Sequence, residues 1–200
     1  MTIAERQALT PDLPQPHRFT RDEYYRLADL GLFQHQRVEL IAGEIVDMSP
    51  PKDTHAITLG LVIRAMERAF PAHWVRPQLP LSFAADSEPE PDIAVVRGVP
   101  RDYLGIGHHP EMAMLVIEIA DTSLLYDRKA KAEIYAAASI ADYWIINLRD
   151  RCIEVHRDPV AEPSAPPTHR YQTVPVLKAP AAICPLASPS TAVPVADLLT

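Results

Sequence analysis

The chain has 200 residues, of which 48% are hydrophobic and 22% charged, and a formal net charge of −7. These totals predict one ordinary soluble domain and argue against a broad basic face for nucleic acid, although a local one is compatible with them. No apolar run reaches the roughly 18 residues that a membrane span needs. The N-terminus lacks the apolar core of a signal peptide, and Cys152 and Cys184 form no C-x-x-C pair. We therefore expect a cytoplasmic protein without a disulfide framework.

Local patterns predict the elements of the N-terminal half. Residues 1–19 are expected to form a polar arm, and residues 20–200 a single domain. A helix is expected to begin at Thr20, which has capping-box spacing to Glu23. The other elements expected here are a hairpin over 37–50 around Ala42-Gly43, a helix over 53–70 capped by Asp53, and strands within 74–83 and 88–98.

The C-terminal half predicts a strand–helix–strand unit. The run "MAMLVIEIA" reads as a buried strand, residues 127–140 as a helix, and 142–148 and 152–157 as further strands. The first strand, the helix and the next strand can form a right-handed βαβ crossover. Nine prolines follow Asp158, so we expect loop structure there with one strand in "RYQTVPV". The fold class is therefore α/β or α+β, a mixed sheet flanked by helices.

A carboxylate interrupts the apolar run of the central strand. Glu118 follows six apolar residues, and burying an unpaired carboxylate costs several kcal/mol or more. Asp92 opens the preceding β-branched run, so the two carboxylates lie near one end of the sheet if their strands are neighbours. A divalent cation such as Mg²⁺ would relieve their repulsion. The alternatives are that Glu118 pairs with a buried Arg or Lys, or faces water at a sheet edge.

The helix after this strand carries a lysine on its apolar face. Lys131, Ile134, Tyr135 and Ala138 fall at i, i+3, i+4 and i+7, whereas Lys129 lies on another side. Lys131 is therefore a candidate for an ammonium directed at the carboxylates, where it would stabilise phosphate charge. The alternative is a snorkelling lysine whose ammonium stays in water.

Three segments of the chain carry a family resemblance. The segments "RVELIAGEIVDMSP", "PDIAVV" and "VIEIADTSLLYDRKAKAEIYAAASIADYWIIN" resemble the Uma2 family of the PD-(D/E)xK restriction-endonuclease-like superfamily. The similarity runs from about Thr20 to Leu199, and the block from Glu118 to Asn147 is its most specific part. It implies a restriction-endonuclease-like core that uses Mg²⁺ or Mn²⁺ and acts on DNA.

The resemblance also assigns the main site residues. Asp92 matches the Asp of the PD motif, and Glu118 matches the acid of the (D/E)xK motif. That motif would place a lysine at position 120, where this chain has Ala120. The family pattern places its lysine in the following helix, so Lys131 is taken as the displaced lysine.

Further candidates come from the same resemblance. Glu39 matches an upstream acid and would be a third metal ligand beside Asp92 and Glu118, with Glu44 near enough in sequence to compete for that role. His55 matches a histidine after the "SP" turn, and its alternative is a structural hydrogen bond at a helix start. Asp127 is a second-tier candidate that can equally be a carboxylate favoured by the helix dipole.

The expected function is that of a Mg²⁺-dependent endonuclease hydrolysing DNA phosphodiester bonds. The first rival is a non-catalytic nucleic-acid-binding or interaction module on the same fold, which the acidic charge and Ala120 favour. The second is a glycosidase using Asp92 and Glu118, with carboxyl groups about 5–10 Å apart and no cation between them. A homodimer would suit an enzyme that cuts two strands, but no pattern in the sequence requires one.

Overall fold

The structure is a computed structural model that describes residues 14–164 and 167–200. Most of the expected N-terminal arm, residues 1–13, therefore lies outside the described residues, as do residues 165–166. The described part of the arm, residues 14–19, has no helix or strand, and its end is fixed by a hydrogen bond from Phe19 N to Gly43 O at 2.9 Å. The domain boundaries drawn from the sequence stay a prediction.

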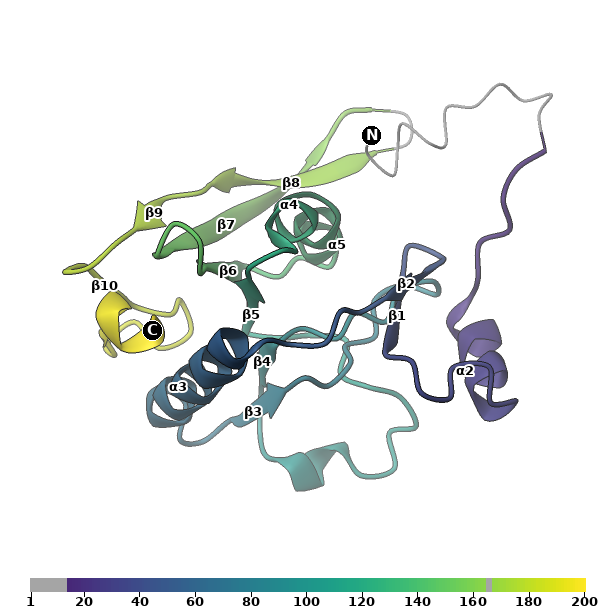
Figure 1. Cartoon of the computed structure of the whole chain (residues 1–200), viewed down its shortest axis with the longest axis horizontal. Coiled ribbons are helices and arrows are strands. Elements are labelled where there is room, and N and C mark those ends of the chain that lie inside the picture. Colours follow the sequence, from purple (N-terminus) through teal and green to yellow (C-terminus); the bar gives the residue numbers. More distant parts are fainter. Residues whose placement is uncertain (1–13, 165–166) are drawn as a thin grey trace.

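A mixed sheet forms the centre of the molecule (Figure 1). Its strand order is β3-β4-β5-β6-β7-β8, with β9 paired to β7. β5 and β6 are parallel, while the other neighbours are antiparallel. The strands are β3 (Trp74–Pro77), β4 (Ile93–Val96), β5 (Leu115–Ala120), β6 (Asp142–Asn147), β7 (Cys152–Glu162), β8 (Thr168–Thr173) and β9 (Val176–Leu177).

Helices and two small hairpins surround this sheet (Figure 1). The expected α/β class and the βαβ crossover from β5 to β6 are both confirmed. None of the described helices combines the length and apolarity that crossing a membrane requires. The helical segments are α2 (Arg21–Asp29), α3 (Asp53–Ala69), α4 (Leu124–Tyr126), the π-helical turn η2 (Asp127–Lys131), α5 (Ala132–Ala137), and the 3₁₀ turns η1 (Pro100–Tyr103) and η3 (Val195–Leu198); the hairpins are β1 (Val38–Ile41) with β2 (Glu44–Asp47) and β10 (Ala182–Ile183) with β11 (Val193–Pro194).

Each face of the sheet packs against its own layer. Ile117 and Ile119 of β5 belong to the core on the α3 side, together with η3. Val116 and Ala120 belong to the core on the α5 side. Because side chains alternate along a strand, Glu118 lies on the α5 side as well. This alternation directs the one carboxylate of β5 toward the helix that carries Lys131.

Local backbone geometry explains the first hairpin. Ala42 has φ 48° and Gly43 has φ 77°, the two positive angles of a type I′ turn, which matches the twist of the flanking strands. Glu39 pairs with Val46 in the resulting register. The expected capping box of α2 is present too, since Thr20 and Glu23 each accept a backbone hydrogen bond from the other.

Several expected boundaries are wrong. Lys52, not Asp53, is the N-cap of α3, and it makes no side-chain capping bond. Helical structure begins at Leu124 rather than at position 127, because the buried Leu124 joins the core on the α5 side. The strand expected within 74–83 ends at Pro77, and the positive φ of 48° at Gln78 turns the chain away.

The proline-rich tail holds more strand than expected. β7 continues to Glu162 through Pro159, which pairs with Tyr171 of β8. β6 pairs with β7 only as far as Arg157, so Pro159 lies where β7 has a single neighbour. Proline is tolerated there because its missing N–H interrupts no ladder on the open side.

Candidate functional site

Asp92 and Glu118 meet on neighbouring antiparallel strands. Ile93 pairs with Ile117, which places Asp92 directly before β4 opposite the end of β5. Asp92 N donates to Glu118 Oε2 at 3.2 Å, and Ile119 N donates to Asp92 Oδ2 at 2.8 Å. Each carboxylate is therefore held by the backbone of the other residue's strand. The two acids therefore lie beside each other on adjacent strands, and their sharing of one cation stays a prediction.

Lys131 is buried between two carboxylates. Its Nζ donates to Glu39 Oε2 at 2.6 Å and to Glu118 Oε1 at 3.2 Å. Lys131 is 1% exposed, so the snorkelling alternative is wrong. Burial alone would lower the pKa of Lys131, but the charges of Glu118 and Glu39 more than offset it and raise that pKa above its usual value. The ammonium is therefore charged at neutral pH.

Glu39 enters the site from the first hairpin. Its side chain is fully buried, and its Oε2 also accepts from Glu90 N at 3.0 Å. Its Oε1 is buried without a hydrogen-bond partner among the described residues. Glu44, the competing candidate, pairs with Arg18 at 2.8 Å and does not line the cleft that holds Lys131. Glu39 therefore lies in the cleft, whereas Glu44 lies outside it.

Tyr135 completes the surroundings of Glu118. Its hydroxyl donates to Glu118 Oε1 at 2.6 Å from the helical turn after Lys131. Burial raises the pKa of Glu118 to about 8, against the lowering effect of Lys131, and the charge of Asp92 adds to the rise. The sequence places Tyr135 on the correct helix face, but nothing in the pattern identifies it as a hydrogen-bond donor to the site.

The two secondary candidates also reach the site. His55, in the first turn of α3, lies with its Nε2 at 3.1 Å from Asp92 Oδ2, and this hydrogen bond raises the pKa of His55. Asp127 is 4% exposed and accepts from Ser123 Oγ at 2.7 Å. Burial raises the pKa of Asp127 to about 6. It begins the π-helical turn, three residues after helical structure starts at Leu124, so its role in the site stays a prediction.

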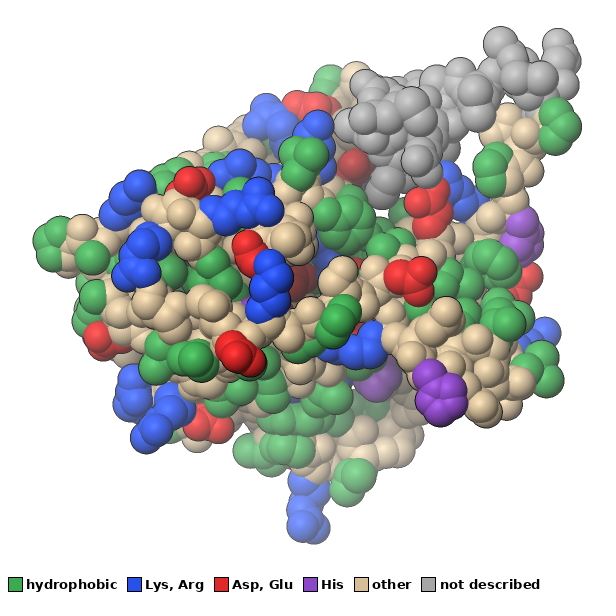
Figure 2. All heavy atoms as spheres, viewed as in Figure 1, with side chains coloured by type: hydrophobic (Ala, Val, Ile, Leu, Met, Phe, Trp, Pro, Cys, Tyr) green, Lys and Arg blue, Asp and Glu red, His purple; other side chains and the backbone are tan. Residues whose placement is uncertain are grey.

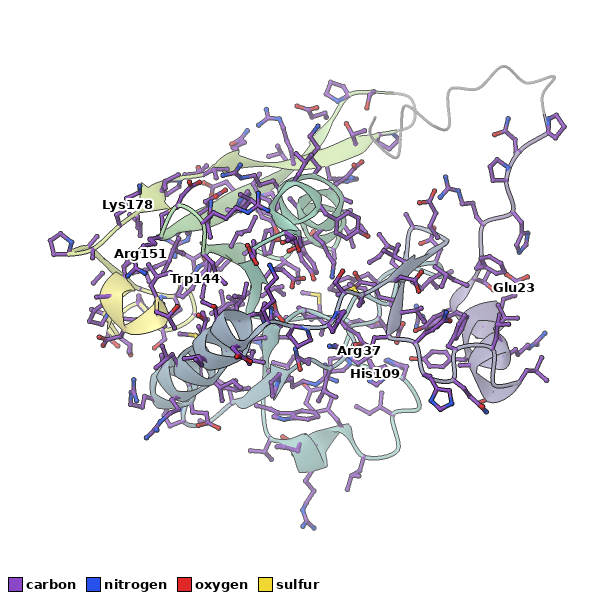
Figure 3. The ribbon with its side chains drawn as sticks, viewed as in Figure 1. Glu23, Arg37, His109, Trp144, Arg151 and Lys178 are labelled. Carbon is purple, nitrogen blue, oxygen red and sulfur yellow. The ribbon has the colours of Figure 1, made fainter. Side chains whose placement is uncertain are left out.

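One cleft of about 800 Å³ is lined by Glu39, His55, Asp92, Glu118, Asp127 and Lys131. Figure 3 labels Arg37, which also lines this cleft and approaches Glu90 Oε2 at 3.5 Å. Residues of the cleft that the sequence did not identify include Gln78, whose Nε2 lies 3.5 Å from Asp92 Oδ1, and Tyr126. They stand on turns and helix starts, where residue type alone gives no indication of a site.

The acidic side chains of the cleft fit a hard divalent cation. Seven Asp and Glu side chains line the cleft, and four of them, from Glu39, Asp92, Glu118 and Asp127, are the candidates from the sequence; the cleft also holds the buried ammonium of Lys131. Within residues 14–164 and 167–200, no three His, Cys, Asp or Glu side chains form a ready set of ligands around one point. Mg²⁺ does not need such a set, since it is usually bound by one or two carboxylates together with waters and substrate phosphate.

Comparisons with known proteins agree with this architecture. A crystal structure described as "a putative nuclease belonging to DUF820 from Anabaena variabilis ATCC 29413" matches with a TM-score of 0.65 and 17% identity, over 90% of this chain and 97% of that chain. At this identity the likeness shows the fold alone. Among curated proteins none matches the chain. The Uma2 family, described as "Putative restriction endonuclease", matches residues 21–194. The chain belongs to the Uma2 family.

Proposed function

We propose that this protein is a divalent-metal-dependent endonuclease that hydrolyses DNA phosphodiester bonds. Membership of the Uma2 family and the nuclease-like fold support a nuclease-like function. The observation that carries the proposal is the ammonium of Lys131, held at 3.2 Å from Glu118 although position 120 of the strand is an alanine. The α5 side of the fold thus supplies the positive charge that the strand lacks.

Asp92 and Glu118 would hold the metal. Glu118 accepts from Lys131 Nζ through Oε1 and from Asp92 N through Oε2. Its Oε2 therefore faces Asp92, the second proposed metal ligand. The orphaned Oε1 of Glu39 and the raised pKa of Glu118 are features that a nearby cation would relieve. When bound, Mg²⁺ or Mn²⁺ polarises a phosphoryl oxygen and lowers the pKa of the attacking water.

The chain's own residues then have separate roles. Lys131 stabilises the negative charge that develops on the phosphoryl oxygens, in a position that excludes water. Glu39 holds the ammonium from the opposite side through Oε2, and its orphaned Oε1 would be available to the metal, directly or through water. His55 orients the carboxylate of Asp92 through its hydrogen bond to Oδ2.

The structure also favours one alternative by a specific observation. Lys131 is fully paired with two carboxylates, which is the arrangement of a structural ion network as well as of a catalytic one. A non-catalytic DNA-binding module on the same fold would retain this network. Activity, and not geometry, distinguishes the two.

Plasmid nicking tests the proposal. Purified wild type should convert supercoiled DNA to nicked or linear forms with Mg²⁺ or Mn²⁺, and chelation of the metal by EDTA should abolish the conversion. Asp92→Asn should be inactive while remaining folded by circular dichroism. Lys129→Ala is the matched control, because Lys129 is exposed and lies outside the cleft. Wild-type cleavage by Asp92→Asn, or an inactive wild type in both metals, would contradict the proposal.

A further inference from the structure

A second charged cluster lies at the mouth of the same cleft. Lys52 Nζ donates to Asp121 Oδ2 at 2.7 Å, and Arg149 Nε lies 3.6 Å from Asp121 Oδ1. One carboxylate thus meets two cations, one on each oxygen. Lys52 and Asp121 line the cleft that holds Glu118 and Lys131, so this cluster is continuous with the proposed site.

The fold brings the cluster together from three elements. Lys52 is the N-cap of α3, Asp121 directly follows β5, and Arg149 follows β6. β5 and β6 are parallel, so their carboxyl ends lie at the same edge of the sheet, and Leu148 N donates to Ala120 O there at 3.0 Å. Figure 1 shows the start of α3 beside this end of β5. The positive end of the α3 dipole adds to the same local potential.

The cluster is more exposed than the buried ion pair between Arg128 and Glu154. The side chains of Lys52 and Arg149 are 69% and 54% exposed, and that of Asp121 is 36% exposed. In contrast, Arg128 binds Glu154 through two hydrogen bonds, and the side chain of Glu154 is 5% exposed. Exposed ion pairs contribute little to stability, so another anion can displace Asp121 at small cost.

A polyanion needs such a cluster to approach this cleft. The chain carries a net charge of −7, and seven Asp and Glu side chains line the cleft itself. On the face of the molecule drawn in Figure 2, the Lys and Arg side chains gather in patches and do not cover the surface evenly. DNA must therefore be met by local positive charge beside the carboxylates. The two non-bridging oxygens of a phosphodiester resemble the two oxygens of the Asp121 carboxylate.

We infer that Lys52 and Arg149 form a second phosphate subsite at the cleft mouth, in which Asp121 occupies the anion position until a DNA phosphate displaces it. This inference rests on the proposed function, because the strand bound here is the one whose neighbouring phosphate reaches Glu118. Lys52 and Arg149 position the strand and take no part in the reaction. Asp121 weakens binding in the free protein by competing for both cations.

Equilibrium binding of a short fluorescent DNA duplex tests the subsite. Anisotropy is measured in EDTA across a range of NaCl concentrations, so cleavage does not interfere. Lys52→Ala and Arg149→Ala should each bind several-fold more weakly, and each should reduce the slope of log K against log salt by about 1. Asp121→Asn should bind more tightly than wild type. Arg68→Ala removes an exposed charge at the other end of α3 and should bind like wild type.

The outcomes separate the subsite from the nuclease proposal. Wild-type binding by the two cation variants, weaker binding by Asp121→Asn, or no binding of DNA by wild type overturns the subsite. The subsite for DNA is also overturned if the variants weaken the binding of an RNA duplex but leave the binding of the DNA duplex unchanged. If the pattern holds but wild type does not nick plasmid, the subsite stands and the nuclease proposal fails. If wild type nicks plasmid, the cation variants should raise KM and leave kcat unchanged.

Discussion

At the scale of single residues, Lys131 has a proposed catalytic role and a structural role. Its side chain is buried, and two carboxylates are its partners. Removing one partner of a buried ion network leaves uncompensated charge, which costs about 3–5 kcal/mol. Lys131→Met should therefore abolish cleavage and also lower the free energy of unfolding by that amount. Urea denaturation and plasmid nicking measure the two effects.

A double variant and a control variant help to explain the result expected for Lys131→Met. Lys131→Met/Glu39→Gln removes one of the stranded charges, so it should recover part of the lost stability and none of the activity. Lys129→Ala should match wild type in both measurements. A Lys131→Met protein that unfolds at the wild-type urea concentration would show that the buried network contributes no stability.

Two tyrosines near the site make a matched pair of tests. The hydroxyl of Tyr135 donates to Glu118 Oε1, and a hydrogen bond contributes about 0.5–1.5 kcal/mol, so Tyr135→Phe should lower stability by about that amount. The hydroxyl of Tyr126 is buried with no partner among the described residues, so Tyr126→Phe should cost almost nothing. Thermal or urea unfolding compares them. Equal losses would contradict the assignment of the Tyr135 hydrogen bond.

At the scale of elements, the first hairpin fixes the position of Glu39. Gly43 has φ 77°, and an added Cβ would lie 2.7 Å from Arg18 Cβ. Gly43→Ala should therefore destabilise the protein by more than about 1 kcal/mol and reduce cleavage, because Glu39 loses its register. Gly60, within α3, has open space around its added Cβ, and Gly60→Ala should stabilise the protein by about 0.4–1 kcal/mol. Unfolding midpoints give the comparison, and a tolerated Gly43→Ala would be the contrary result.

The elements also show where sequence patterns succeed. The capping box at Thr20, the Ala42-Gly43 turn and the buried strand β5 are encoded by neighbouring residues, and all three are found. The start of α4 and the length of β7 depend on contacts with distant strands, and they were missed. Local chemistry fixes turns and caps, whereas tertiary pairing fixes where a strand ends.

At the scale of the whole molecule, a buried histidine couples folding to pH. His156 is 6% exposed between the rings of Tyr143 and Tyr171, and burial lowers its pKa to about 4. The unfolded chain, with an ordinary histidine pKa of about 6.5, binds the proton first, so stability contributed by neutral His156 is lost as pH falls from about 6.5 to about 4. At about 1.36 kcal/mol per pKa unit, the loss amounts to about 3 kcal/mol.

A comparison of two proteins isolates this effect from the carboxylates of the cleft. His156→Gln should show a smaller loss of stability than wild type between pH 6.5 and 4, measured by urea unfolding at several pH values. Parallel curves for the two proteins would show that His156 does not titrate differently in the folded and unfolded states.

The site as a whole was partly predictable from sequence. The family resemblance and the helical period together identify Glu39, Asp92, Glu118 and Lys131, and the structure brings all four together. The period alone left open whether Lys131 is buried, because a lysine on an apolar face can also extend to water. Partners such as Tyr135 and the Asp121 cluster depend on three-dimensional neighbours, for which one sequence carries no pattern.

The two cross-strand hydrogen bonds of Asp92 and Glu118 have a consequence for the cooperativity of metal and DNA binding. Each carboxylate already accepts a backbone hydrogen bond, and the pair offers two acids rather than a complete set of metal ligands. On the proposed function, substrate phosphate and water would supply the further ligands, so Mg²⁺ and DNA are expected to bind synergistically. By thermodynamic linkage, the factor by which DNA increases Mg²⁺ affinity equals the factor by which Mg²⁺ increases DNA affinity. Titrations in both orders, with an uncleavable phosphorothioate duplex, should give the same factor above one, and Asp92→Asn should reduce it to one.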